Sequence, residues 1–446
     1  MKIVKASEIG EYAVERLLTK AAFDEVELNP KIREANKKTF GRDMSAAELV
    51  RQIVNDVRKD GDKAVINYTK LIDKVEFTPA DFLVSEEEFA AAEAAADKKV
   101  VASLKKAAEN VRRYHQEQKP NSWITYRDQG SILGQSIIPL DRVGIYVPGG
   151  TAAYPSSVIM NAVPAAVAGV REIIMMVPPK NGKINPYVLI AAKLAGVKKI
   201  YKIGGAQAIA AMAFGTETIP RVDKITGPGN IFVTLAKKEV YGHVDIDMLA
   251  GPSEILIVAD KTADPVYTAA DMLSQAEHDM LASSIVITDD EELANKVAKE
   301  AEKQLAKLPR REIAAASIER NGLIVIADDI MQAMRFANVS APEHMEILTA
   351  EPFKLLPYVH HAGAVFLGAY SPEPLGDYFA GPNHVLPTGG TARYYSVLNV
   401  ETFMKRTSII SYTQEALASA SDDIIRLAET EGLDAHANAI KIRRNG

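Results

Sequence analysis

One short segment of the sequence, from Leu273 to His278, could bind a metal ion through an amide oxygen and an imidazole nitrogen. Asp264 and Pro265 precede it, and this pair is typical of a helix start, because Asp caps the first turn and Pro fits the first helical position. On such a helix Gln275 and His278 lie three residues apart on one face. Nitrogen and oxygen ligands without a thiolate suit a catalytic Zn²⁺ site better than a structural zinc.

Three further groups of side chains could complete a metal or acid–base site: Glu343-His344, Asp377 with His384, and His436. Alone, the amide–imidazole pair also fits an ordinary polar helix face. The hypothesis of a metal site therefore depends on the elements that would bring these groups together.

The composition excludes several classes of protein. A chain of 446 residues is too long for one ordinary core, so it predicts two or three domains. A formal net charge of −6, without a long Lys/Arg run, leaves no basic surface for nucleic acid. The absence of cysteine excludes a disulfide framework, an iron–sulfur cluster and a thiolate nucleophile, and it fits a reducing cytoplasm.

No segment resembles a targeting or membrane-spanning sequence. The N-terminus, MKIVK, lacks the apolar core of a signal peptide. The longest apolar stretch, Val158 to Val170, is interrupted by Asn161 and Pro164 and is shorter than the ~20 residues of a membrane span. We therefore expect a soluble, cytoplasmic protein.

Hydrophobic periodicity divides the chain into a helical region and a region in which predicted strands and helices alternate. Residues 1–35 are predicted to form a helix and a mixed-charge connector, and residues 36–125 to be helical. From Val143, short β-branched segments alternate with Ala-rich helical ones. The predicted strands lie at 143–147, 172–177, 199–203, 224–226, 254–258, 284–288, 323–326 and 364–367. Two such series predict twin α/β domains with parallel sheets and helices on both faces, followed by a mostly helical stretch from about Ser396.

Three glycine-rich turns follow predicted strands, at 146–150 (YVPGG), 204–207 (GGAQ) and 227–230 (GPGN). In open α/β sheets ligands bind beyond the carboxyl ends of strands, and a turn that leads into a helix N-terminus favours phosphate. None of the three is a GxGxxG fingerprint. From these turns alone, a dinucleotide site and tight connections without a ligand both remain open.

Eight motifs, in this order along the chain, resemble those of histidinol dehydrogenase. They are GIYVPGG at 144–150, GGAQAIA at 204–210, DKITGPGN at 223–230, AGPSE at 250–254, LSQAEH at 273–278, APEH at 341–344, GDY with NHVLPT within 376–388, and EGLDAH at 431–436. The resemblance covers the chain from about residue 30 to the end.

Carried over residue by residue, the resemblance implies zinc ligands at Gln275, His278, Asp377 and His436, and acid/base residues at Glu343 and His344. It implies substrate contacts at Ser253, Gln275, His278, His344, Asp377, Glu431 and His436. It implies NAD contacts at Tyr146, Gln207 and Asn230. The sequence keeps the family's residue at each of these positions.

The remaining histidines are expected to take no direct part in the chemistry. His384 lies beside the site in the sequence but outside the family's ligand positions, so we expect it to support the site. His115 lies in an Arg/Lys/Gln-rich helix, which predicts a solvated side chain. His243, His360 and His361 have no neighbouring residues in the sequence that would suggest a metal or catalytic site.

The resemblance also implies an architecture of twin incomplete Rossmann-like α/β domains with a small helical N-terminal segment and a C-terminal helical tail. We expect the segment at 1–35, a first domain with most metal and catalytic residues at 36–142 and 250–395, an NAD-contacting domain at 143–249, and the tail at 396–446. The family is a homodimer with one zinc per subunit, in which each tail completes the partner's site. Glu431 and His436 would then act across the interface.

The implied reaction is the oxidation of L-histidinol to L-histidine by two NAD⁺ through L-histidinaldehyde, the last step of histidine biosynthesis. We expect His344 to take the alcohol proton and Glu343 to activate the water that adds to the aldehyde. Zinc would hold the substrate's imidazole and amino nitrogens. Without a cysteine, the second oxidation has to pass through a hydrate or a non-thiol adduct.

Three rival functions are a related NAD-dependent dehydrogenase of another small hydroxylated compound such as a sulfonated diol, a non-catalytic NAD- or metabolite-binding module, and a zinc hydrolase. Glu431 and the ligand set favour an amino alcohol that bears imidazole over a diol. The acid/base pair Glu343-His344 argues against a binding module. The two dinucleotide-like α/β series argue against a hydrolase.

Overall fold

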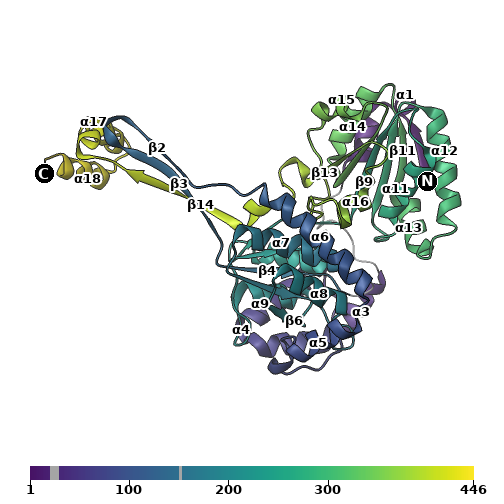
Figure 1. Cartoon of the computed structure of the whole chain (residues 1–446), viewed down its shortest axis with the longest axis horizontal. Helices are drawn as coiled ribbons and strands as arrows, with labels where there is room; N and C mark the ends of the chain where they lie inside the picture. The colour runs from purple at the N-terminus through teal and green to yellow at the C-terminus, as the bar shows by residue number, and fades with distance from the viewer. Residues whose placement is uncertain (21–29, 150–152, 446) are drawn as a thin grey trace. The chain divides into compact units, whose positions relative to one another are not determined.

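The computed structural model describes residues 1–20, 30–149 and 153–445. Residues 21–29 of the expected N-terminal segment, and Gly150 at the end of the first glycine turn, lie outside the described residues. The chain divides into two compact units, Met1–Gln118 with Asp141–Phe403, and Lys119–Leu140 with Met404–Gly446 (Figure 1). Among the described residues, no helix is long and apolar enough to cross a membrane.

A six-stranded parallel sheet in the larger unit has the order β1-β11-β10-β9-β12-β13. Its strands are β1 (Lys2–Lys5), β9 (Glu254–Ala259), β10 (Ser283–Thr288), β11 (Gly322–Ile326), β12 (His344–Leu348) and β13 (Ala364–Leu367). Every residue of β9, β10 and β12 is buried, as expected for parallel strands covered on both faces.

Helices cover both faces of this sheet. One core contains residues of α2 (Glu11–Leu18) and α14 (Ile330–Ser340), and the opposite core contains residues of α11 (Pro265–Ala276), α12 (Glu291–Leu305) and α13 (Arg311–Asn321). Alternate residues of the central strands enter the two cores, because successive side chains of a strand point to opposite faces. The unit also contains the short helices α1 (Ala6–Ile9), α15 (Pro352–Leu355) and α16 (Glu373–Tyr378) and the 3₁₀ turns Leu356–Tyr358, Thr391–Arg393 and Val400–Phe403.

A second parallel sheet in the larger unit has the order β6-β5-β4-β7-β8. Its strands are β4 (Arg142–Tyr146), β5 (Glu172–Met176), β6 (Lys199–Tyr201), β7 (Lys224–Thr226) and β8 (Asp245–Ile246), and its crossover helices are α7 (Pro155–Ala168), α8 (Pro186–Ala195), α9 (Gly205–Phe214) and α10 (Ile231–Val240). The twin parallel α/β architecture expected from the sequence is confirmed.

The helical segment before residue 118 is grouped differently from the expectation. Its helices are α3 (Pro30–Phe40), α4 (Ala46–Ile72), α5 (Glu86–Ala95) and α6 (Lys98–Gln116), with a 3₁₀ turn at Pro79–Asp81. Buried residues of α4 share one core with α9, α10 and the five-stranded sheet, rather than with residues 250–395. The apolar stripe of an amphipathic helix shows that it must be buried, but not against which sheet, so the sequence could not make this assignment.

The smaller unit combines a three-stranded antiparallel sheet with two helices. The sheet has the order β14-β3-β2, formed by β14 (Met404–Ser411), β3 (Ile132–Pro139) and β2 (Trp123–Tyr126), and a 3₁₀ turn lies at Asp128–Gly130. The helices α17 (Gln414–Thr430) and α18 (Asp434–Asn445) follow. The expected C-terminal helices are present, but the C-terminal part of the unit begins at Met404 rather than residue 396, and the unit also contains residues 119–140 and strands that the sequence analysis missed.

Candidate active site

The expected acid/base pair lies at the amino end of two neighbouring strands of the six-stranded sheet. His344 is the first residue of β12, and Glu254 is the first residue of β9, which pairs with β12. The His344 Nδ1 atom lies 2.9 Å from the Glu254 carbonyl oxygen, and the Glu254 N–H donates to Glu343 Oε2 at 2.8 Å. One backbone residue therefore fixes both side chains.

The tautomer of neutral His344 follows from its backbone contact. Since a carbonyl oxygen only accepts, Nδ1 must carry a hydrogen, and Nε2 is left with the lone pair that a general base needs. Nε2 is buried and has no hydrogen-bond partner within the described part of the chain. It lies 3.7 Å from Asp377 Oδ1 and 3.9 Å from Glu373 Oε1, so it faces a group of carboxylates.

Burial and neighbouring charge act in opposite directions on this pair. Burial lowers the pKa of His344, but the carboxylates of Glu343 and Asp377 outweigh it and raise that pKa to about 10. Burial raises the pKa of Glu343 to about 8. A cation beside Asp377 would offset the local negative charge, and would thereby favour the neutral imidazole and the ionised Glu343 that act as bases.

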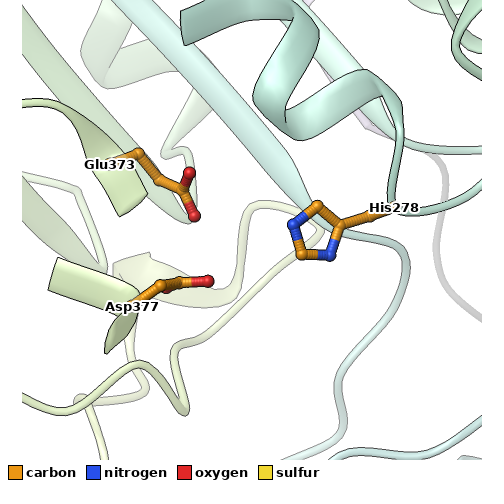
Figure 2. A group of neighbouring side chains, drawn as sticks. All are labelled: His278, Glu373 and Asp377. Carbon is orange, nitrogen blue, oxygen red and sulfur yellow. The ribbon is translucent and has the colours of Figure 1, made fainter. Parts of the chain in front are cut away.

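A group of side chains with metal-binding chemistry lies beside His344. One ligand atom from each of His278, Glu373 and Asp377 lies within 4.8 Å of the others. Figure 2 shows the two carboxylates facing the His278 ring. Burial lowers the pKa of His278, which favours the neutral ring that a metal requires. The donor set fits a divalent cation such as Zn²⁺.

Gln275 adds a further donor. Its side chain is buried, and its Oε1 atom has no hydrogen-bond partner among the described residues. An amide oxygen of this kind is costly to bury unless a ligand takes it up. The orphaned oxygen supports the assignment of Gln275 to a cation site.

Glu373 is a candidate ligand that the sequence analysis missed. It is the first residue of α16 and lies four residues before Asp377, which places both carboxylates on one side of a short helix. This spacing was visible in the sequence. However, Pro374 and Gly376 both disfavour helix, so the segment was interpreted as a turn and the spacing was not recognised.

Two local expectations need correction. Helix α11 ends at Ala276, so His278 lies in the following turn, where its N–H donates to the Gln275 carbonyl at 3.2 Å. His115 is fully buried rather than solvated. Its Nδ1 atom contacts the Val111 carbonyl at 2.7 Å, and Asn383 lies 3.3 Å from its Nε2. Helix α6 buries this face although its composition is strongly polar.

The neighbours of the site include Ser253 and His384. Ser253 directly precedes Glu254, and its carbonyl accepts the Ser283 N–H at 3.0 Å. The His384 Nδ1 atom lies 3.0 Å from the Asp377 carbonyl oxygen, while its Nε2 lies 3.4 Å from Ser157 Oγ. His384 therefore contacts the backbone of a candidate ligand.

The three expected NAD contacts lie at the carboxyl ends of strands in the five-stranded sheet. The Tyr146 hydroxyl accepts the Gly205 N–H at 3.1 Å. Gln207 is fully buried, and neither polar atom of its amide has a hydrogen-bond partner in the described residues. Asn230 caps α10 through its side chain. Gly227 has a φ of +111°, and an added Cβ would lie 2.1 Å from the Tyr146 carbonyl oxygen, so only glycine allows this close turn.

The last two expected site residues belong to the smaller unit. Glu431 is the C-cap of α17, and His436 lies in the first turn of α18. Both side chains are exposed. Their part in the site remains a proposal.

Comparison with known proteins agrees with this arrangement. Residues 36–444 match the family described as histidinol dehydrogenase. The histidinol dehydrogenase of Heliobacterium mobile is 56% identical over 408 residues, which cover 91% of this chain and 95% of that protein. That of Bacillus subtilis is 55% identical over 397 residues, which cover 89% and 92%. The crystal structure of histidinol dehydrogenase from Elizabethkingia anophelis has a TM-score of 0.91 and 37% identity, and the match covers 99% of this chain and 98% of that one.

The chain combines two parallel α/β sheets with a buried histidine–carboxylate pair beside a group of side chains that could hold a metal ion, an arrangement that fits an α/β enzyme. The chain belongs to the histidinol dehydrogenase family. It is therefore an oxidoreductase.

Proposed function

We propose that this enzyme oxidises L-histidinol to L-histidine through L-histidinaldehyde, with two NAD⁺ as hydride acceptors and one Zn²⁺ in each site. The observation that carries the proposal is the buried His344 Nε2, free of other partners among the described residues and directed at Asp377 and Glu373. A base in this position can reach a substrate that lies against the same carboxylates.

The first oxidation removes a hydride and a proton from the alcohol. We assign the proton to His344 Nε2, while the hydride passes to the nicotinamide. The contact between Nδ1 and the Glu254 carbonyl keeps the ring in the productive tautomer and stabilises the imidazolium that forms.

The second oxidation requires water to add to the aldehyde. We assign the removal of the water proton to Glu343, which the Glu254 N–H holds next to His344. As water adds, protonated His344 returns its proton to the carbonyl oxygen, which forms the hydrate and restores the neutral ring. The hydrate then loses its hydride to the second NAD⁺ and a hydroxyl proton to His344. Since the chain has no cysteine, the hydrate replaces the thiohemiacetal of thiol-dependent aldehyde oxidation.

The residues that would hold zinc are Gln275, His278 and Asp377, with His436 from the smaller unit and Glu373 as a further candidate. Bound zinc would supply positive charge and a template for the imidazole and amino nitrogens of the substrate. Ser253 and Glu431 are proposed to contact the substrate. For NAD we propose Tyr146, Gln207 and Asn230, and the unpartnered amide of Gln207 supports a ligand there.

We further propose a homodimer in which the smaller unit completes the partner's site. The smaller unit has a very small core, formed by Ile425, Ala428 and Ala437. It leaves large apolar side chains exposed, among them Ile410 (73%) and Leu427 (67%). A unit with so little buried apolar surface needs a second surface to be stable.

The test is an assay of the purified enzyme with L-histidinol and NAD⁺, before and after metal removal by a chelator. We expect NADH formation with the native enzyme, loss after chelation, and recovery when Zn²⁺ is restored. A sulfonated diol serves as the alternative substrate. Preference for the diol would overturn the assignment of L-histidinol, and full activity of metal-free enzyme would overturn the role of zinc.

A further inference from the structure

Two further buried carboxyl groups, those of Asp271 and Glu346, lie on elements that carry residues of the candidate site. Asp271 precedes Gln275 by one turn of α11, and Glu373 precedes Asp377 by one turn of α16. Glu346 follows His344 by two residues on β12, so both side chains point to the same face of the sheet. Helix α11 and strand β12 therefore each carry one site residue and one additional carboxyl group, while α16 carries two candidate ligands, Glu373 and Asp377.

Glu346 joins these three elements. Its Oε1 atom accepts the backbone N–H of Glu373 at 2.8 Å, and its carboxyl group lies beside the carboxyl group of Asp271 and interacts with it. Glu346 is fully buried, and Asp271 is 9% exposed. A direct hydrogen bond joins α11 to α16, because Ser274 Oγ donates to Glu373 Oε2 at 3.2 Å. The contacts converge where α11 and α16 approach β12.

The N–H that Glu346 accepts belongs to the first residue of α16. The first N–H groups of a helix have no partner within it, and the N-cap residue of α16, Pro372, provides no side-chain hydrogen bond. A helix of six residues is also too short to be stable alone. The position of α16, and hence of Asp377, therefore depends strongly on the Glu346 contact.

Stability alone does not account for a buried carboxyl group at this position. Replacing buried polar or ionic groups by apolar residues of similar volume is often neutral or stabilising. One oxygen of Glu346 accepts the Glu373 N–H, and the carboxyl group interacts with that of Asp271. A glutamine keeps an oxygen that can accept the Glu373 N–H and has an amide N–H that can donate to Asp271.

We propose that Glu346 is a positioning residue, which fixes α11 and α16 on β12 so that Gln275 and His278 on one side and Asp377 on the other can bind the same cation. The inference rests on the zinc site of the proposed function. Carboxyl groups that orient metal ligands from behind typically contribute 10–100-fold to metal affinity.

The experiment compares Glu346→Gln and Glu346→Met in the full-length enzyme. Zinc affinity is measured by competition with a chromogenic chelator, and Tm is measured without metal. We expect Glu346→Met to bind zinc about 10–100-fold more weakly with an unchanged or higher Tm, and Glu346→Gln to keep wild-type affinity. Ser284→Ala is the matched control, because the buried Ser284 Oγ donates to the Met272 carbonyl of α11 at 2.7 Å and has no bond to α16. This variant should bind zinc normally.

Three other outcomes would contradict the positioning role, and a fourth would contradict the zinc site. Wild-type zinc affinity in Glu346→Met would overturn the positioning role, and so would a Tm well below wild type, which would make Glu346 a stability residue. Equal loss of affinity in Glu346→Gln and Glu346→Met would show that negative charge matters rather than the hydrogen-bonded bridge. A wild-type enzyme that binds no zinc would instead remove the proposed zinc site itself.

Discussion

At the scale of single residues, Glu254 connects the two proposed acid/base groups through its main chain rather than its side chain. Its carbonyl oxygen contacts His344 Nδ1, and its N–H donates to Glu343. Any residue with the same backbone position could make these two contacts, so the sequence does not predict that Glu254 makes them. The pairing of β9 with β12 brings the three residues together.

The two acid/base roles predict different effects of substitution. Glu343→Gln keeps an oxygen for the Glu254 N–H, so the fold should persist, but the amide cannot remove a proton from water. We expect this variant to slow oxidation of supplied L-histidinaldehyde by about 10²–10⁴-fold, far more than formation of the aldehyde from the alcohol. Single-turnover measurements of NADH separate the two steps.

His344→Asn should show the complementary defect. The alcohol proton loses its acceptor, so we expect the first hydride transfer to fall by about 10²–10⁴-fold. Equal and mild losses on alcohol and aldehyde in both variants would contradict the assigned roles. Circular dichroism of each variant provides the control for folding.

At the scale of elements, the sequence predicted most strands and helices of the α/β sheets but missed several short strands. Predicted bounds match the structure for β7 and β13. In contrast, β12 was missed although it carries His344, because HMEIL contains buried polar residues that break the apolar pattern of a central strand. The strand β14 was missed because it pairs with β3, which lies far away in the sequence.

Candidate site residues that lie in recognisable sequence motifs could be predicted. Residues whose role depends on contacts between elements far apart in the sequence could not. Gln275, His278 and Asp377 were identified from their types and from the family resemblance. Glu346 was not identified, because its proposed function depends on the contact between α16 and β12. The spacing of residues along the sequence does not show that contact. The burial of His115 depends in the same way on its contact with Asn383.

The C-terminal end of α4 gives a prediction for stability. Asp73 is the C-cap of this helix, and one of its carboxylate oxygens is buried without a hydrogen-bond partner in the described chain. Burial raises the pKa of Asp73 to about 6. Between the pKa of the unfolded chain, about 4, and this value, the folded state retains a proton that the unfolded state releases, so stability falls as pH rises.

We therefore expect Asp73→Asn to stabilise the protein at pH 7.5 by on the order of 2 kcal/mol, and to have little effect near pH 4. Removal of a negative charge from a helix C-terminus acts in the same direction. Urea unfolding of both proteins at the two pH values provides the measurement. A gain that does not depend on pH would show that Asp73 is not the titrating group.

At the scale of the whole molecule, the proposed dimer predicts complementation between two inactive variants. His278→Ala alters the larger unit, and His436→Ala alters the smaller one. In a heterodimer with shared sites, one site would collect both lesions and the other would be wild type. After random subunit exchange, about a quarter of all sites should regain activity. If each subunit held a complete site, the mixture would stay inactive although exchange occurs, which mass spectrometry of the mixed dimers can verify.

The most direct test of the central proposal is the number of NADH molecules formed for each L-histidinol consumed. If His344 is the base and Glu343 activates water, as proposed, the neighbouring pair serves both oxidations in one enzyme. Complete conversion should therefore give two NADH and one L-histidine for each L-histidinol, with little free aldehyde at any time. A ratio of one NADH, with L-histidinaldehyde accumulating in solution, would contradict the proposal that this site carries out both steps.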